Sequence, residues 1–287
     1  VLGGYLVLQE RMNIGQFVAA EIIIILIINS VEKVLRTIEN IYDVLTALEK
    51  IGYVTDLELD QDRGYAMIDT DTAISVAARN IYFKFPNDLN PIFDGLSFDI
   101  AQKDRVLLKG KSGSGKSLLL QIMAGIHDVE RGQLFFNGMS SELYQRESFY
   151  QALGVSFPTN QIFEGTLREN ITLGRDITDL EITEVARKLN LWDFIIQQPQ
   201  GMQNILDSGG RRLPRSIIQK VLIARTIINQ PKLLLMEDPL QFIAEEEKKT
   251  IIDYLMNGSH NWTVVVVSDF VYWSEKCNKV IDLDVDN

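Results

Sequence analysis

The sequence has little of several things on which larger classes of protein depend. It contains one cysteine, Cys277, so no disulfide bond can form within the chain. Its 28 lysines and arginines are outnumbered by 39 aspartates and glutamates, which gives a net charge of −11 at pH 7. Because a protein that binds the phosphate backbone of nucleic acids needs a basic face, we expect no nucleic-acid partner. We find no signal peptide, and since the 287-residue chain begins inside an apolar run, we expect it to be a fragment of a longer protein.

Apolar residues are plentiful, and near the N-terminus they form a long run. The stretch from Phe17 to Ile28 is shorter than the ~20 residues that span a bilayer and carries Glu21, so taken alone it also fits a buried helix of a soluble protein. Residues 22–28 are apolar on all sides, however, and the amphipathic segment 30–51 continues the helix without glycine or proline. This pattern is typical of a membrane helix whose far end projects into the cytosol.

The remainder of the chain alternates between strand and helix patterns. Predicted strands lie at residues 80–85, 96–100, 105–109, 230–238 and 261–269, the last two as continuous apolar runs with polar ends. Predicted helices lie at residues 116–124, 179–189, 214–229 and 244–257. The order predicts an α/β fold, a mixed or parallel sheet with a helical insertion. We predict three regions: the end of a transmembrane domain at 1–50, an acidic linker at 51–71 and an α/β domain at 72–287.

A glycine-rich loop follows the predicted strand 105–109. Gly110, Gly115, Lys116 and Ser117 match the pattern G-x-x-x-x-G-K-[ST], with a strand before it and a helix after it. The glycines let the backbone aim N–H groups at the β-phosphate of ATP, Lys116 reaches the β- and γ-phosphates, and the Ser117 hydroxyl is a Mg²⁺ ligand. The alternative is a glycine-rich turn without a ligand. The predicted ATP-binding residues of this loop are Gly110, Lys111, Ser112, Gly113, Ser114, Gly115, Lys116, Ser117 and, at position 118, Leu118.

Around this loop the chain resembles the ATP-binding cassette (ABC) exporters of the half-transporter type. Residues 3–19 are similar to the outer loop before that family's last membrane helix. Residues 117–138, 163–174 and 221–238 are similar to the segments after its Walker A loop, after its Q-loop and before its catalytic carboxylate. The resemblance implies a P-loop cassette that works as a dimer, with each ATP held between the Walker A loop of one cassette and the signature helix of the other. The resemblance also implies that closure of the dimer on ATP drives the membrane helices to alternate between two arrangements.

Two further contacts of the family can be placed by position. Phe85 falls where the family stacks an aromatic ring on adenine, although a core phenylalanine on an edge strand gives the same pattern. The glutamine of the Q-loop, which in the family contacts Mg²⁺ or the attacking water, falls on Pro158. Proline has no polar side-chain group to offer, and Gln161 comes three residues late.

The signature L-S-G-G-Q of the family falls on residues 213–217, which read LPRSI. Both glycines that allow close backbone approach to the γ-phosphate are absent, and Pro214 supplies no N–H group. Three arginines, Arg211, Arg212 and Arg215, crowd the same helix start. They either attract a phosphate across a dimer interface by charge or are solvated surface residues.

The acidic positions of the site are also altered. Where the family has Asp then Glu after its Walker B strand, this chain has Glu237 on the Mg²⁺ side and Asp238 at the general-base position. Asp238 is shorter by one methylene, roughly 1.5 Å of reach. A slip of one residue, with Asp238 as the metal-side acid and no base, is the alternative. Asp269 occupies the position of the switch histidine, and residues 241–244 lack the Ser and Asp of the family's D-loop.

These departures predict a cassette that binds MgATP and hydrolyses it slowly or not at all. We expect an exporter subunit that pairs with a second ABC half-transporter, in a bacterial inner membrane with the cassette on the cytoplasmic side. Two other hypotheses stay open at this point. One is a fully active homodimeric exporter ATPase with divergent motifs, and the other is an ATP-dependent switch or scaffold that does not hydrolyse ATP. The export substrate is not identified by the sequence.

Overall fold

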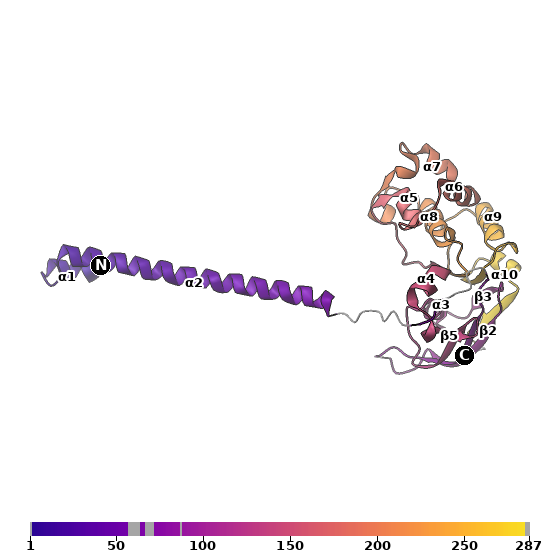
Figure 1. Cartoon of the computed structure of the whole chain (residues 1–287), viewed down its shortest axis with the longest axis horizontal. Helices are drawn as coiled ribbons and strands as arrows, with labels where there is room; N and C mark the ends of the chain where they lie inside the picture. The colour runs from indigo at the N-terminus through magenta and orange to yellow at the C-terminus, as the bar shows by residue number, and fades with distance from the viewer. Residues whose placement is uncertain (1, 57–63, 67–71, 87, 285–287) are drawn as a thin grey trace. The chain divides into compact units, whose positions relative to one another are not determined.

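The computed structural model of the chain describes residues 2–56, 64–66, 72–86 and 88–284. They form two compact units, one within Val1–Gln61 and the other within Asp62–Asn287 (Figure 1). Of the linker predicted at residues 51–71, positions 57–63 and 67–71 lie outside the described residues. The two units are therefore taken separately below.

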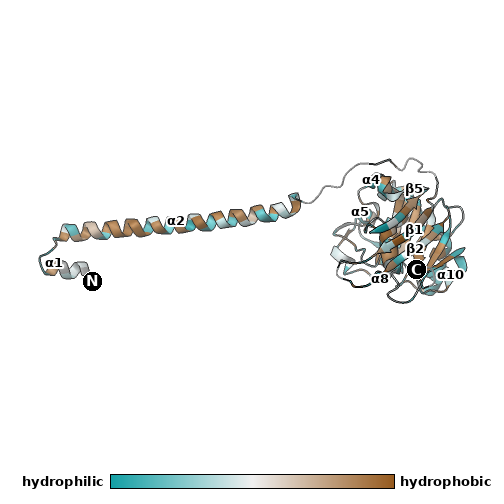
Figure 2. Ribbon diagram, turned by 90° about the horizontal axis from the view of Figure 1, so that it is seen from below, coloured by the Kyte–Doolittle hydropathy of each residue, from teal (hydrophilic) through white to brown (hydrophobic). Residues whose placement is uncertain are grey.

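The first unit consists of two helices, α1 (Leu2–Leu8) and the 42-residue α2 (Ile14–Thr55). A capping box starts α2: the side-chain oxygen of Asn13 accepts a hydrogen bond from the Gln16 N–H at 2.7 Å, and the Gln16 side chain accepts one from the Asn13 N–H at 3.1 Å. Hydrophobic residues run along α2 (Figure 2), and none of its residues is buried. Within the described part of the chain, α2 is the only helix long and apolar enough to cross a membrane.

The second unit contains an antiparallel and a parallel sheet. The antiparallel sheet has the strand order β2-β1-β4-β5. Its strands are β1 (Val76–Phe83), β2 (Phe93–Ile100), β4 (Arg131–Phe136) and β5 (Met139–Ser140). The parallel sheet has the order β11-β3-β10-β9-β6. Its strands are β3 (Arg105–Lys109), β6 (Leu153–Ser156), β9 (Leu233–Glu237), β10 (Thr263–Val267) and β11 (Lys279–Asp282).

Side chains of the central parallel strands alternate between two hydrophobic cores. Leu233 and Leu235 of β9 belong to the core shared with the antiparallel sheet, whereas Leu234 and Met236 belong to the core beneath the helical part. Both faces of the sheet are therefore covered, which explains why β9 and β10 read as continuous apolar runs in the sequence. Parallel strands also end at one edge, so the loops after β3, β9 and β10 share that edge.

Helices pack around the parallel sheet and form the helical part of the unit (Figure 1). Four of the helices are α3 (Lys116–Met123), α4 (Arg146–Ala152), α9 (Glu245–Leu255) and α10 (Tyr272–Lys276). The helical part holds α5 (Leu167–Thr172), α6 (Asp179–Lys188), α7 (Trp192–Gln197) and α8 (Arg215–Ile227), with the short strands β7 (Gly165–Thr166) and β8 (Ile205–Leu206). The described residues of this unit also form three 3-10 helices: η1 (Ser141–Leu143), η2 (Gly201–Gln203) and η3 (Ser208–Gly210).

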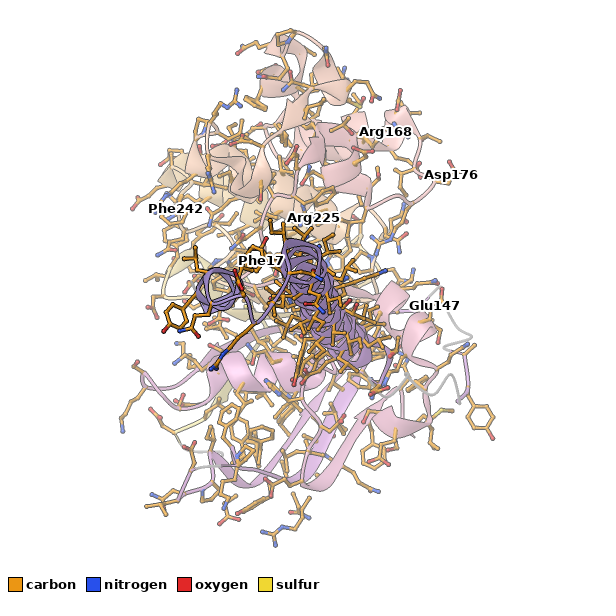
Figure 3. All side chains as sticks on the ribbon, turned by 90° about the vertical axis from the view of Figure 1, so that its left-hand side faces the viewer. Phe17, Glu147, Arg168, Asp176, Arg225 and Phe242 are labelled. Carbon is orange, nitrogen blue, oxygen red and sulfur yellow. The ribbon has the colours of Figure 1, made fainter. Side chains whose placement is uncertain are left out.

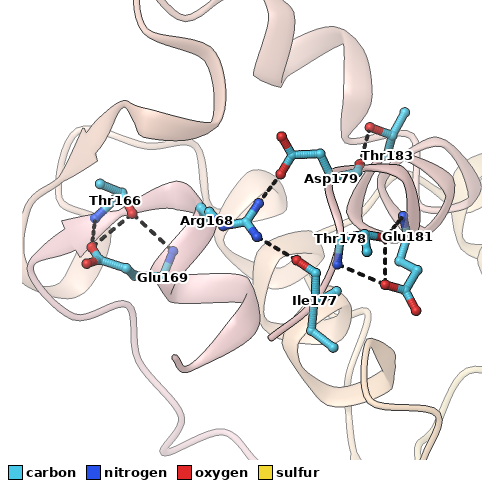
Figure 4. Close-up of polar contacts among 8 residues, drawn as sticks. All are labelled: Thr166, Arg168, Glu169, Ile177, Thr178, Asp179, Glu181 and Thr183. Atoms are coloured by element: carbon cyan, nitrogen blue, oxygen red, sulfur yellow. Dashed lines mark hydrogen bonds and ion pairs between the residues drawn. The ribbon is translucent and has the colours of Figure 1, made fainter. Parts of the chain in front are cut away.

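Side-chain caps hold the helical part together at α5 and α6. Each of these helices begins with a capping box of threonine and glutamate, Thr166 with Glu169 and Thr178 with Glu181. Arg168 of α5 forms an ion pair with Asp179, the first residue of α6, so the two helix starts are tied to each other (Figure 4).

The α/β fold predicted from the sequence is confirmed, and β3 has the predicted bounds 105–109. The predicted strand 80–85 is wrong in position, because β1 runs from Val76 to Phe83 with a register shift after Ala78. Pro86 follows closely and cannot donate a ladder hydrogen bond, so Phe85 lies outside the strand. The antiparallel strands also form a sheet of their own. The helix α2 continues to Thr55, five residues beyond the predicted boundary at 50.

Candidate nucleotide site

The glycine-rich loop between β3 and α3 has a backbone that only glycine adopts readily. Gly110, Gly113 and Gly115 have φ angles of +147°, +85° and +88°. A Cβ on Gly115 would lie 2.7 Å from side-chain atoms of Ile92 and Phe93, so this position is also sterically closed. At Gly113 a Cβ would meet nothing within 4 Å, which leaves open space over the centre of the loop.

Lys116 crosses the loop that precedes it. Its Nζ donates hydrogen bonds to the carbonyl oxygens of Gly110 and Lys111, each at 2.7 Å. The Ser114 hydroxyl is buried, and no hydrogen-bond partner for it lies among the described residues. A buried hydroxyl without a partner is costly, so the loop fits an oxygen-rich ligand that would satisfy it. The Leu118 side chain, in contrast, is 6 % exposed and belongs to the core, so only its backbone remains for a ligand.

The two predicted Mg²⁺ ligands lie next to each other. The Ser117 hydroxyl donates a hydrogen bond to the Glu237 carboxylate at the end of β9. No group of three or more His, Cys, Asp and Glu side chains that could hold a metal occurs in the described ranges. This small donor set fits Mg²⁺, which proteins usually hold with one or two side chains plus substrate phosphates.

The other two acids line two different clefts. Asp269 lines a cleft of about 310 Å³ together with Gly110 and Lys116. Asp238 is exposed and lines a second cleft of about 360 Å³ that also includes Glu237 and Pro158. Asp269 thus shares a cleft with the loop lysine, and Asp238 shares one with Glu237, the acid on the Mg²⁺ side.

Asp238 has an unusual backbone for its residue type. Its φ angle is +40°, and its N–H donates to the Val267 carbonyl at 2.8 Å. This hydrogen bond ties the residue after β9 to the end of β10 and fixes the backbone position from which the Asp238 side chain projects. Gln161, the glutamine that comes late in the Q-loop, is exposed and does not line either cleft.

The segment at the signature position begins α8 and contacts the D-loop position of the same chain. Pro214 is the N-cap residue and makes no side-chain cap hydrogen bond. The Arg215 guanidinium lies 4.8 Å from the centre of the Phe242 ring, and the Gln219 side chain accepts the Phe242 N–H at 2.7 Å. Arg211, Arg212 and Arg215 are all exposed, which fits both alternatives given for them, and Arg215 also has this intramolecular partner. Phe242 projects at the surface, 44 % exposed (Figure 3).

Two cations of α8 have several partners within the fold and were not singled out from the sequence. Lys220 is 7 % exposed at its side chain, forms an ion pair with Glu247 of α9 at 2.5 Å, and donates to the Asn190 carbonyl at 3.1 Å. Arg225 donates to Asn170 and to the Gln161 carbonyl, and burial lowers the pKa of its guanidinium (Figure 3). Both lie inside the apolar run of residues 220–228, and a charge within such a run is the signal that could have found them.

Phe85 lies beyond β1 and is 38 % exposed, so its ring is not part of the hydrophobic core. His260 and Cys277 lie outside the two clefts of the site. His260 precedes β10 and stacks on Trp262 with ring centres 4.0 Å apart. Burial raises the pKa of the Cys277 thiol to about 12, which makes it unreactive.

Comparison with known proteins gives the following likenesses. The ABC transporter family profile matches residues 93–241. The chain is 28 % identical to the ABC transporter BEA3 of Gibberella fujikuroi over 93 % of this chain and 21 % of that protein. It is 24 % identical to the alpha-hemolysin translocation ATP-binding protein HlyB of Escherichia coli over 99 % of this chain and 40 % of that protein. It is 25 % identical to the beta-(1→2)glucan export ATP-binding/permease protein NdvA of Brucella suis, over 99 % and 48 % respectively.

A solved structure shares the fold. A bacterial Atm1-family ABC exporter with ATP bound is similar to this chain with a TM-score of 0.75 and 24 % identity. The match covers 85 % of this chain and 43 % of that one. The chain thus spans between about a fifth and a half of the length of these relatives.

Proposed function

Because the chain belongs to the ABC transporter family, we propose that it is the C-terminal part of an exporter subunit that binds MgATP in its cassette. The observation that carries this proposal is the loop geometry: three glycines with positive φ, Lys116 across the loop, and Ser117 against Glu237. Binding of the nucleotide phosphates then exploits the loop N–H groups, the start of α3 and the Lys116 charge. Mg²⁺ supplies charge neutralisation between the phosphates when bound, and Ser117 and Glu237 would hold it.

The proposed cassette hydrolyses ATP slowly or not at all. Phosphoryl transfer depends on positioning and electrostatics, and several positioning groups of the family are missing here. Pro158 replaces the Q-loop glutamine, and Asp269 replaces the switch histidine. Asp238, at the general-base position, is shorter than the family's glutamate by one methylene. ATP binding, rather than turnover, is then the event that this cassette contributes.

Titration of the purified chain with ATP, followed by a phosphate-release assay, tests both statements. We expect binding that is lost in Lys116→Ala and kept in Lys188→Ala, a control in which an exposed lysine at the end of α6, away from the loop, is removed. We expect phosphate release far below that of an active ABC ATPase. Turnover at an ordinary ABC rate that disappears in Lys116→Ala would refute the proposal of weak hydrolysis, while equal ATP binding by Lys116→Ala would refute the site.

Besides ATP, the proposal includes a protein partner, a second ABC half-transporter. The chain's own signature position reads LPRSI and lacks the glycines that contact a γ-phosphate, so a partner with an intact signature would complete the ATP site of this cassette. The homodimeric ATPase and the non-transporting switch are the other candidates. Export by the homodimer alone in liposomes favours the first of these, and the absence of export with any half-transporter partner favours the second.

The proposed location is a bacterial inner membrane with the cassette on the cytoplasmic side. The exposed apolar run of α2 and the likeness to the Escherichia coli and Brucella suis exporters support it. Replacement of Ile25 by Lys puts a charge within this run and costs about 3 kcal/mol of insertion. We expect Ile25→Lys to reduce the membrane-bound fraction after carbonate extraction, and Asp43→Lys, beyond the apolar run, to leave it unchanged.

A further inference from the structure

His127 lies at the end of α3 that is remote from the phosphate loop. The helix starts with Lys116 and Ser117 and, at about 1.5 Å per residue, is about 12 Å long. After the helix, Gly125 takes a φ of +72°, and the N–H of Ile126 donates back to the Gln121 carbonyl at 2.9 Å. This turn fixes the backbone immediately before His127. One short element therefore carries phosphate ligands at its start and an imidazole ring just beyond its end.

Three aromatic rings meet at this place. The centre of the His127 ring lies 5.9 Å from that of Phe85 with the planes at 89°, and 5.8 Å from that of Phe83 with the planes at 60°. Phe83 and Phe85 are 5.1 Å apart with the planes at 87°. Phe85 thus contacts two rings that stand nearly perpendicular to it, the favourable edge-to-face arrangement of aromatic pairs.

The three rings differ in how firmly they are held. Phe83 is the last residue of β1 and is 6 % exposed, so the core fixes it. Phe85 lies beyond the strand, is followed by Pro86, and is 38 % exposed. Strand pairing does not orient Phe85, so its ring orientation depends on the two perpendicular neighbours. Of these, only His127 comes from the segment that follows the phosphate-binding helix.

We propose that His127 is a positioning residue for the base of the bound nucleotide. It holds the Phe85 ring in the orientation in which the exposed part of that ring stacks on a purine. This inference rests on the proposed function, because it assumes that the loop binds the phosphates of the same nucleotide. The contact acts on the base and leaves the phosphates untouched, so its removal weakens only the part of the affinity that depends on stacking. An edge-to-face contact corresponds to about two- to tenfold in affinity.

The test compares a ligand that has a base with one that has none. The dissociation constants of ATP and of inorganic tripolyphosphate are measured by calorimetry on the full chain in detergent, for wild type, His127→Ala, His127→Phe and Lys116→Ala. We expect His127→Ala to weaken ATP about two- to tenfold and to leave tripolyphosphate unchanged. His127→Phe keeps a ring at this place and should bind ATP as the wild type does. Lys116→Ala should lose both ligands.

The outcomes separate the two proposals. Equal ATP affinity of His127→Ala and wild type overturns the positioning role, and so does a parallel loss of ATP and tripolyphosphate, which would indicate general damage to the fold. If His127→Phe is as weak as His127→Ala, the ring contact is not what matters and the inference is also overturned. Wild-type protein that binds neither ligand overturns the proposed function and this inference with it.

Discussion

The Ser117 hydroxyl donates its hydrogen bond to the Glu237 carboxylate, and this contact joins the start of α3, which follows β3, to the end of β9. The two strands are not neighbours, because β10 lies between them in the sheet. The contact brings the two proposed Mg²⁺ ligands together. Asp238, one residue later, has a left-handed backbone and lines the same cleft as Glu237. Of the two adjacent acids only Glu237 receives the Ser117 hydrogen bond, so the order in which they occur matters.

Restoring the family's order of these acids should raise hydrolysis. In Glu237→Asp/Asp238→Glu the longer acid takes the general-base position, and recovery of about 1 Å of reach corresponds to roughly tenfold or more in rate. Phosphate release at saturating ATP measures the effect, and the ATP dissociation constant should stay within about twofold. Asp238→Asn is the control, since it removes the base and should lower any residual rate. A double variant no faster than wild type would contradict the assigned roles.

Asp269 should penalise a γ-phosphate. It lines the cleft of Lys116, so Asp269→Asn removes a like charge and should tighten ATP more than ADP. The gain should shrink in about 1 M salt, where charges are screened within about 3 Å. Asp176→Asn is the matched control, because Asp176 is exposed at the outer edge of the helical part (Figure 3). Equal changes for ATP and ADP would show that Asp269 does not face the γ-phosphate.

Lys220 should be important for the stability of the cassette. Lys220→Met leaves the Glu247 carboxylate, 25 % exposed, without its ion-pair partner and should lower the free energy of unfolding by about 2 to 3 kcal/mol. Thermal melts followed by circular dichroism measure the loss. The double variant Lys220→Met/Glu247→Leu should recover most of it, because no unpaired charge remains. Lys249→Met, which removes the exposed partner of Glu246, should change stability little.

His260 should make the cassette less stable in mild acid. Burial is the main cause that lowers its pKa below the ordinary 6.5, with a smaller effect from the nearby Arg105 charge. The unfolded chain therefore binds the proton more readily, and stability that is fully present above pH 6.5 is lost as the pH falls through the folded-state pKa. Chemical denaturation between pH 8 and pH 5 measures this slope, which should be smaller in His260→Phe. A slope unchanged by that substitution would assign the pH dependence to other groups.

Local pattern was enough to predict the elements on which the site is built. The apolar run RVLLK predicted the bounds of β3, and the spacing of Gly110, Gly115 and Lys116 predicted the loop. Both depend only on residues that are neighbours in sequence. The Lys220–Glu247 pair could not be predicted, since it joins residues of two helices that only the fold brings together. The same holds for Asp238 and Asp269. Counting positions located them after β9 and β10, but the direction of each side chain depends on the φ of +40° at Asp238 and on the surrounding loops.

The length of α2 has a mechanical consequence. Its 42 residues correspond to about 63 Å, about twice the thickness of a bilayer's hydrocarbon core. From Gln16 to Ile51 it contains no glycine or proline at which a joint could form. The helix is therefore expected to move as one rigid body. A tilt of about 5° around its midpoint displaces each end by about 3 Å. A small reorientation of one end of α2 would therefore reach its other end almost undiminished.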